Sequence, residues 1–129
     1  ILSEVLFSEG LLENFNNKLK SGEKIYCVEK ELLGVTTSEI TAQIFNHWNL
    51  SNKLVNIIEF VDDMENCKNE FKYKSQILDV IKTACDIRFG LTPESINEAI
   101  NKAISYNLDI DSLKKAISIL ENKLTKSLR

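Results

Sequence analysis

The chain has 129 residues, of which 43% are hydrophobic, and this is enough for one core of ordinary domain size but not for two. Its net charge of −3 is spread along the chain, which argues against a nucleic-acid-binding surface with a clustered basic excess. No apolar run approaches the roughly 20 residues that span a bilayer, and no signal peptide with a cleavage site is recognisable. We therefore expect a single domain over residues 1–129, located in the cytoplasm and in contact with neither nucleic acid nor membrane.

Residues that interrupt helices are rare, because proline occurs once and glycine four times. No segment alternates apolar and polar residues for long enough to predict a strand. The expected fold class is all-α, a compact bundle of about six or seven helices that is HD-domain-like. Three cysteines stand far apart without a paired C-x-x-C spacing, and we interpret them as reduced, buried thiols of an intracellular protein: Cys27, Cys67 and Cys85.

The first quarter of the chain predicts two helices. Apolar residues at helical spacing indicate a helix over about residues 2–20, with a kink or break near Gly10. A Ser-Gly turn follows, and a second helix is expected over residues 23–33. Gly34 then stands where a left-handed residue ends a helix.

The next stretch predicts two further short helices. Thr36 and Glu39 form a capping box, after which the apolar residues of one helix share a face: Ile40, Ile44, Phe45 and Trp48. Ser51 can cap the following helix, whose apolar face has four members: Leu54, Ile57, Ile58 and Val61. Trp48 is expected to be a large aromatic anchor between helices, so that its truncation would lower stability markedly.

A polar connection and a long helix come next. Residues 62–70 have little to bury and are expected to be mobile. A helix over about residues 71–89 is expected to stop at Gly90 and to be the central core helix. Its expected inward residues are Ile77, Leu78, Ile81, Ala84, Cys85 and Arg88.

Two helices complete the chain. Thr92 can cap the first of them, since the Pro-Glu pair that follows suits a first helical turn. Either Asp109 or Asp111 can cap the second. The expected inward residues are Ile96, Ile100, Ala103 and Ile104 in the first helix and Leu113, Ala116, Ile117, Leu120 and Leu124 in the second.

Six residues around the capping box form a pattern: Glu29, Leu33, Gly34, Ala42, Trp48 and Leu50. This pattern resembles the core of the HDOD domain, a helical signalling domain related to the HD metal-dependent phosphohydrolases, in its C-terminal part. The family tends to show a Glu, a Leu-Gly pair, a His, a small residue, a Trp-x-Leu-Pro segment and a His pair. The chain departs at three places: Thr37 stands where the first His is common, Ser51 where the Pro is common, and Val61-Asp62 where the His pair is common. Each departure removes a potential metal ligand or a rigid turn.

The resemblance implies a regulatory domain of bacterial signalling pathways, a kind of domain often found beside receiver or cyclic-dinucleotide modules. The HD-like segment of the family would lie upstream of Ile1, so we expect that the chain is the C-terminal part of a longer protein. Other signalling proteins are the expected partners, and a homodimer is among the candidate assemblies. We expect neither a cofactor nor a metal.

Candidate catalytic groups are few. An HD-type site needs several His and Asp ligands around one or two metal ions, and the single His, His47, is interpreted as a surface or partly packed residue. Asp62, Asp63 and Glu65 lack the alternating ligands and the turn glycine of a calcium loop, and we interpret them as a solvated acidic connector. No Ser or Cys has a neighbouring base in a readable motif, and no glycine-rich loop offers a phosphate site.

Two further sets of charged residues have ordinary interpretations. Asp79 and Asp86 are seven residues apart on the predicted long helix, so they would share a face that we expect to be exposed. Four lysines near the C-terminus are interpreted as solvated groups that compensate the helix dipole, with an acidic partner or a membrane surface as the alternative: Lys114, Lys115, Lys123 and Lys126.

These observations favour a non-catalytic bacterial regulatory module that acts through protein–protein contacts. One alternative is the scaffold half of an HD-type metal-dependent phosphohydrolase whose ligands lie upstream of Ile1. Another is a helical adaptor unrelated to the HD group. An HD-type His and His-Asp doublet in an upstream segment would favour the enzyme.

Overall fold

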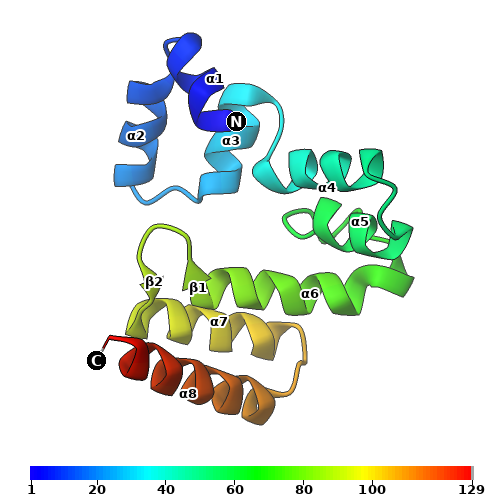
Figure 1. Cartoon of the computed structure of the whole chain (residues 1–129), viewed down its shortest axis with the longest axis vertical. Helices are drawn as coiled ribbons and strands as arrows, with labels where there is room; N and C mark the ends of the chain where they lie inside the picture. Colours follow the sequence, from blue (N-terminus) through cyan, green and yellow to red (C-terminus); the bar gives the residue numbers. More distant parts are fainter. Residues whose placement is uncertain (129) are drawn as a thin grey trace. The chain divides into compact units, whose positions relative to one another are not determined.

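The structure is a computed structural model that describes residues 1–128, and the chain divides into two compact units, Ile1–Cys67 and Lys68–Arg129. The all-α fold class is confirmed, since eight helices and one two-stranded hairpin form the regular structure of the described residues. The prediction of a single domain stays a prediction. The elements (Figure 1) are α1 Leu2–Ser8, α2 Leu12–Lys20, α3 Ile25–Leu33, α4 Thr37–His47, α5 Asn52–Glu59, α6 Asn69–Ala84, β1 Cys85–Asp86, β2 Gly90–Leu91, α7 Pro93–Ser105 and α8 Ile110–Ser127.

Charge is divided unequally between the two units. Residues 1–67 carry 11 acidic and 5 basic side chains, which gives a net charge of −6. Residues 68–129 carry 8 acidic and 11 basic side chains, which gives a net charge of +3. The even spread of charge that we expected is therefore wrong at the scale of the units. Among the described helices, none has the length and apolarity needed to cross a membrane.

The segment predicted as one helix over residues 2–20 is two helices, α1 and α2, and the expected break at Gly10 is confirmed. Gly10 has a φ angle of 70°, a left-handed conformation that glycine adopts readily. Across the turn, the Leu11 N–H donates to the Leu6 carbonyl at 2.8 Å. The predicted end of α3 is also confirmed, because Gly34 follows it with a φ angle of 72°.

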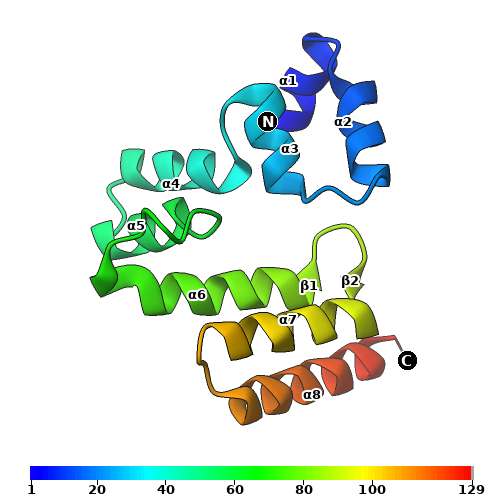
Figure 2. The ribbon, with the colours of Figure 1, turned by 180° about the vertical axis from the view of Figure 1, so that it is seen from behind.

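Both predicted caps of the next two helices are present. The Thr36 hydroxyl accepts a hydrogen bond from the Glu39 N–H at 3.1 Å, and the Glu39 carboxylate accepts one from the Thr36 N–H at 2.9 Å. The Ser51 hydroxyl accepts from the Leu54 N–H at 3.4 Å and so begins α5. Helices α4 and α5 pack against each other (Figure 2). The first unit buries a small set of apolar residues: Leu6, Val28, Ala42, Val55, Val61 and Cys67.

The cysteines differ from one another in burial. Cys67 is 5% exposed, as predicted, and it is the last residue of the first unit. Cys27 and Cys85 are exposed, so the prediction of buried thiols is wrong for these two. Cys27 lies in the first turns of α3, and Cys85 lies in β1.

Helix α6 ends at Ala84, earlier than the predicted helix over residues 71–89, and the chain continues into the β1–β2 hairpin. The cause is local. The Asp86 carboxylate accepts a hydrogen bond from the Arg88 N–H at 2.7 Å, and such a bond from a side chain to nearby backbone competes with continuation of a helix. Cys85 and Arg88, which were expected to face inward from a helix, are therefore exposed residues of the hairpin.

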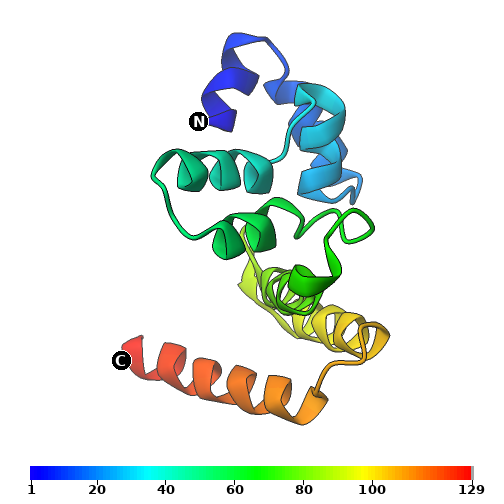
Figure 3. The same cartoon turned by 90° about the vertical axis from the view of Figure 1, so that its right-hand side faces the viewer.

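In the second unit, α6 packs against α7, and α7 packs against α8 (Figures 1 and 3). The core lies where α6 and α7 meet, and its four buried members are small: Val80, Ala84, Ala99 and Ala103. Larger apolar residues pack around it: Leu91, Tyr106, Leu108, Ile110 and Leu113. Of the residues predicted to face inward, several are instead 47–59% exposed: Ile81, Ile104 and Leu124.

The caps of the last two helices follow the sequence signals. Thr92 forms a capping box with Ser95, in which the Thr92 hydroxyl accepts from the Ser95 N–H at 3.1 Å. Asp109, rather than Asp111, caps α8, and its carboxylate accepts from the Asp111 N–H at 3.1 Å. The Ser112 hydroxyl donates to the same carboxylate and lowers the pKa of Asp109.

Candidate functional site

A polar site of the first unit lies at the corner between α3 and α4, where Glu29 is buried. Glu29 is 6% exposed. Its Oε2 accepts a hydrogen bond from the Thr37 N–H at 2.9 Å, and its Oε1 accepts one from the Thr37 hydroxyl at 2.6 Å. Backbone N–H groups in the first turn of a helix have no partner within that helix. The buried carboxylate of α3 therefore completes the start of α4.

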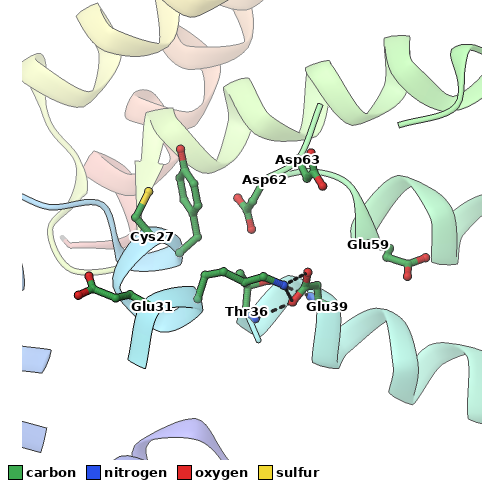
Figure 4. Close-up of a pocket in the computed structure, with 9 residues that line it drawn as sticks. Cys27, Glu31, Thr36, Glu39, Glu59, Asp62 and Asp63 are labelled. Atoms are coloured by element: carbon green, nitrogen blue, oxygen red, sulfur yellow. Dashed lines mark hydrogen bonds and ion pairs between the residues drawn. The ribbon is translucent and has the colours of Figure 1, made fainter. Parts of the chain in front are cut away.

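A second carboxylate crosses the same corner in the opposite direction. Glu39 on α4 accepts hydrogen bonds from Nζ of Lys30 on α3, at 2.8 Å to Oε1 and 3.0 Å to Oε2. Partial burial acts to raise the pKa of Glu39, but the hydrogen bonds from Lys30 and the Thr36 N–H outweigh it and hold the pKa below its ordinary value of 4.5. Glu39 is therefore an ionised, paired group at neutral pH. The dashed lines at Glu39 in Figure 4 mark these bonds.

The other residues of the HDOD-like pattern lie around this corner or along α4. Gly34 has the left-handed conformation, and its N–H donates to the Lys30 carbonyl at 3.0 Å. Leu33 is half-buried at the end of α3. Ala42 is 1% exposed on α4.

Trp48 is not the core anchor that the sequence predicted, because it is 65% exposed. It is the residue that ends α4, and Asn49 after it has a φ angle of 57°, which turns the chain away toward α5. The Trp48 ring stacks on Phe45, with ring centroids 6.3 Å apart. Leu50 and Leu54, close to it in the chain, are 39% and 40% exposed. We call Phe45, Trp48, Leu50 and Leu54 the Trp48 surface.

A pocket of about 460 Å³ opens beside the α3–α4 corner (Figure 4). Five carboxylates and a single lysine ammonium account for its charged lining, and this lysine, Lys30, is already paired with Glu39. The pocket therefore favours cationic over anionic groups. Its lining residues are Tyr26, Cys27, Lys30, Glu31, Thr36, Glu39, Glu59, Asp62 and Asp63.

Two of the three residues predicted to form a solvated acidic connector, Asp62 and Asp63, line this pocket. Asp63 and Glu65 are exposed, as expected, and the Asp63 carboxylate accepts hydrogen bonds from the Asn66 amide at 2.9 and 3.1 Å. Asp62 is half-buried and lines the pocket, so it is not simply solvated. In the part of the chain that the structure describes, no three His, Cys, Asp or Glu side chains converge as they would around a metal ion.

The single histidine and the C-terminal lysines lie on the surface. His47 is exposed in the last turn of α4, which confirms its interpretation as a surface residue. Exposure is likewise found for the four lysines of α8: Lys114, Lys115, Lys123 and Lys126.

Asp79 contradicts the sequence analysis, which placed it on an exposed face together with Asp86. Asp79 is 9% exposed, and its Oδ1 accepts a hydrogen bond from Lys102 Nζ at 3.0 Å. Its Oδ2 accepts from the Tyr106 hydroxyl at 2.6 Å. Lys102 Nζ also donates to the Thr83 hydroxyl at 2.8 Å, so a buried polar network ties α6 to α7 and to the residue that ends it.

A sequence signal for this network existed but was weak. Asp79 is four residues after Ser75 and five before Ala84, and all three are buried on α6. A charge on a buried helical face requires partners, yet both partners are more than 20 residues away in the chain. Periodicity alone could not identify them.

The β1–β2 hairpin holds Asp86 in a different setting. Arg88 Nη2 pairs with Asp86 Oδ2 at 3.0 Å, and the Arg88 guanidinium lies 5.1 Å from the centre of the Phe89 ring. The hydrogen bonds from Arg88 hold the pKa of Asp86 below its ordinary value, against the effect of burial. Ile87 and Phe89 are 86% and 71% exposed at the tip.

Comparison with known proteins gives a fold but no family. No family model matches the chain, and none of the curated proteins matches it. Among solved structures, it is similar to the crystal structure of a virulence factor (cj0248) from Campylobacter jejuni subsp. jejuni, with a TM-score of 0.59 and 20% sequence identity. The match covers 87% of this chain and 44% of that one, so the chain spans less than half the length of the solved structure.

Proposed function

We propose that this chain is a non-catalytic regulatory module of bacterial signal transduction that acts through protein–protein contacts and resembles the C-terminal part of an HDOD domain. The observation that carries the contact function is the Trp48 surface. A tryptophan that is 65% exposed and stacked on Phe45 is a large, rigid apolar group in water. Aromatic residues are enriched in the cores of interfaces, and tryptophan is enriched among the residues that dominate binding energy.

The α3–α4 corner supports the resemblance. Glu29 and Gly34, two residues of the HDOD-like pattern, both have defined roles there: one completes the start of α4 and the other ends α3. Thr37, at the position where the family often has a His, offers a hydroxyl and an N–H to Glu29 instead of an imidazole. The non-catalytic part of the proposal rests on this replacement and on the Val61-Asp62 pair in place of two His residues.

The scaffold half of an HD-type phosphohydrolase is the competing proposal. It would require metal ligands from outside this chain, placed against a corner whose carboxylate is already engaged by Thr37. Phosphodiesterase assays on cyclic dinucleotides, with manganese, iron or zinc supplied, separate the two. Turnover that depends on the metal would replace the interaction module by the enzyme.

The contact function is tested by affinity capture with the wild-type chain, Trp48→Ala and Tyr73→Ala. Tyr73 is a matched control, because it is an exposed aromatic of the second unit with an exposure of 63%. We expect a discrete set of partner proteins that the wild type and Tyr73→Ala retain and Trp48→Ala loses. Retention of the same partners by Trp48→Ala would contradict the assignment of the Trp48 surface.

A further inference from the structure

The link between α3 and α4 is short and the two helices have few close approaches. Only Gly34, Val35 and Thr36 separate the helices, and Gly34 is left-handed. Helix α4 packs extensively along α5, whereas α3 and α4 have almost no backbone approach to each other. Few backbone positions of α3 and α4 therefore lie close enough together to fix the angle between these helices.

Side-chain bonds supply what the packing does not. Glu29 reaches from α3 to the first residue of α4, Thr37. Glu39 reaches back from α4 to Lys30 on α3. The two carboxylates cross the Gly34 link in opposite directions. A side chain of α3 bonds the start of α4, and a side chain of α4 bonds the last turn of α3.

The same two helices also form walls of the pocket. Tyr26, Cys27 and Lys30 come from α3, and Glu39 comes from α4. A change in the angle between the helices would widen or narrow the pocket. Of the two pairs that cross the link, Lys30–Glu39 is the one that a competing cation or high salt can reach. Its side chains are 54% and 31% exposed.

We propose that the Gly34 link is a hinge within the first unit, held closed by the crossed pairs Glu29–Thr37 and Lys30–Glu39. The Glu29–Thr37 pair, in which the Glu29 carboxylate is buried, sets the closed position. The Lys30–Glu39 pair is accessible to solvent and stabilises the closed position. Hinges are commonly a few link residues that absorb the change in backbone angle, and Gly34 is the residue with that freedom.

The single tryptophan makes the hinge measurable in the full chain. Trp48 ends α4, and an acceptor dye on Asn16→Cys would report α2, which packs against α3. Cys27→Ser and Cys85→Ser remove the exposed native thiols, and Cys67 is buried. Time-resolved energy transfer from Trp48 then gives the distribution of distances across the link.

We expect a narrow distribution in this labelled parent at low salt. Lys30→Gln should broaden it, Thr37→Val should broaden it further, and the double variant should be the broadest. Added salt should broaden the parent distribution but leave Lys30→Gln unchanged, because the salt-sensitive pair is already absent. An ion pair that stabilised the fold without restraining the link would leave the distance distribution independent of salt.

Arg88→Gln is the matched control, since the Arg88–Asp86 pair has a length of 3.0 Å and side-chain exposures of 33% and 26% but lies in the second unit. It should leave the distance distribution unchanged. Far-ultraviolet circular dichroism identifies any variant that has unfolded, and Thr37→Ala, which also removes the hydroxyl, then replaces Thr37→Val. A folded double variant with the distribution of the parent would overturn the hinge.

Discussion

The helices within each of the two units are held by different kinds of interaction. In the second unit, α6 and α7 meet through small buried residues and are tied by the buried Asp79 network. In the first unit, α3 and α4 are joined by a glycine link and two crossed carboxylates, and an exposed tryptophan ends α4. A buried polar network fixes the helices of the second unit, whereas for the first unit we propose adjustment at the Gly34 link and contact through the Trp48 surface.

The largest expected loss of stability comes from breaking the Asp79 network of the second unit. Asp79→Ala removes the acceptor of Lys102 and Tyr106, and loss of one partner from a buried charge pair costs about 3 kcal/mol of unfolding free energy. Urea unfolding of the full chain measures this cost. Tyr106→Phe, which removes one donor, should cost less. An Asp79→Ala variant as stable as wild type would mean that the network does not hold α6 and α7.

The corresponding change at the α3–α4 corner should cost less. Glu29→Ala removes the carboxylate that accepts from the Thr37 N–H and hydroxyl, and loss of hydrogen bonds to a charged group costs about 2 kcal/mol of unfolding free energy. Thr37→Val, which keeps the N–H bond, serves as the smaller companion change. Urea unfolding compares the stability of the two variants. A larger loss of unfolding free energy for Thr37→Val than for Glu29→Ala would contradict the geometry.

Acid should lower the stability of the first unit, because it protonates Glu39. The pKa of Glu39 is depressed in the folded state, so its contribution to stability is present above its ordinary pKa of 4.5 and is lost as the pH falls through the folded-state pKa. Glu39→Gln should therefore be less stable than wild type at neutral pH, with the difference shrinking below about pH 4.5. An undiminished difference in strong acid would argue against an ionic role.

The smallest expected effect on stability is that of Trp48→Ala. Its side chain is 65% exposed, and exposed substitutions usually change the unfolding free energy by about 0.5 kcal/mol or less. Tyr73→Ala, its matched control, should behave alike in thermal melting. A loss of several kcal/mol for Trp48→Ala alone would restore the core anchor that the sequence predicted.

Local signals in the sequence predicted local structure well. The stops at Gly10 and Gly34 and the caps at Thr36, Ser51 and Thr92 are all present, because each depends on backbone bonds within a few residues. The hairpin after Ala84 was missed because Asp86 and Arg88 fit a helical period as well as a turn. Periodicity cannot detect a carboxylate that bonds its own neighbouring backbone.

The candidate site was predicted less well than the fold. Glu29 and Gly34 were identified through the resemblance, but the bonding of Glu29 to Thr37 depends on the angle between two helices. Trp48 was placed inward because it continues the apolar face of α4, yet it falls on the residue where the helix ends and the face turns outward. The partners of Asp79 lie on another helix and beyond it, so only the tertiary structure reveals them.

Site-specific photo-crosslinking tests the contact function most directly. A photoreactive phenylalanine analogue is placed at position 48 or position 73 of the full chain in cells that produce it. The two native residues are both exposed aromatics, at 65% and 63%, in different units. We expect a discrete crosslinked protein from position 48 and none from position 73. Equal crosslinking at both positions, or none at position 48, would contradict the contact function.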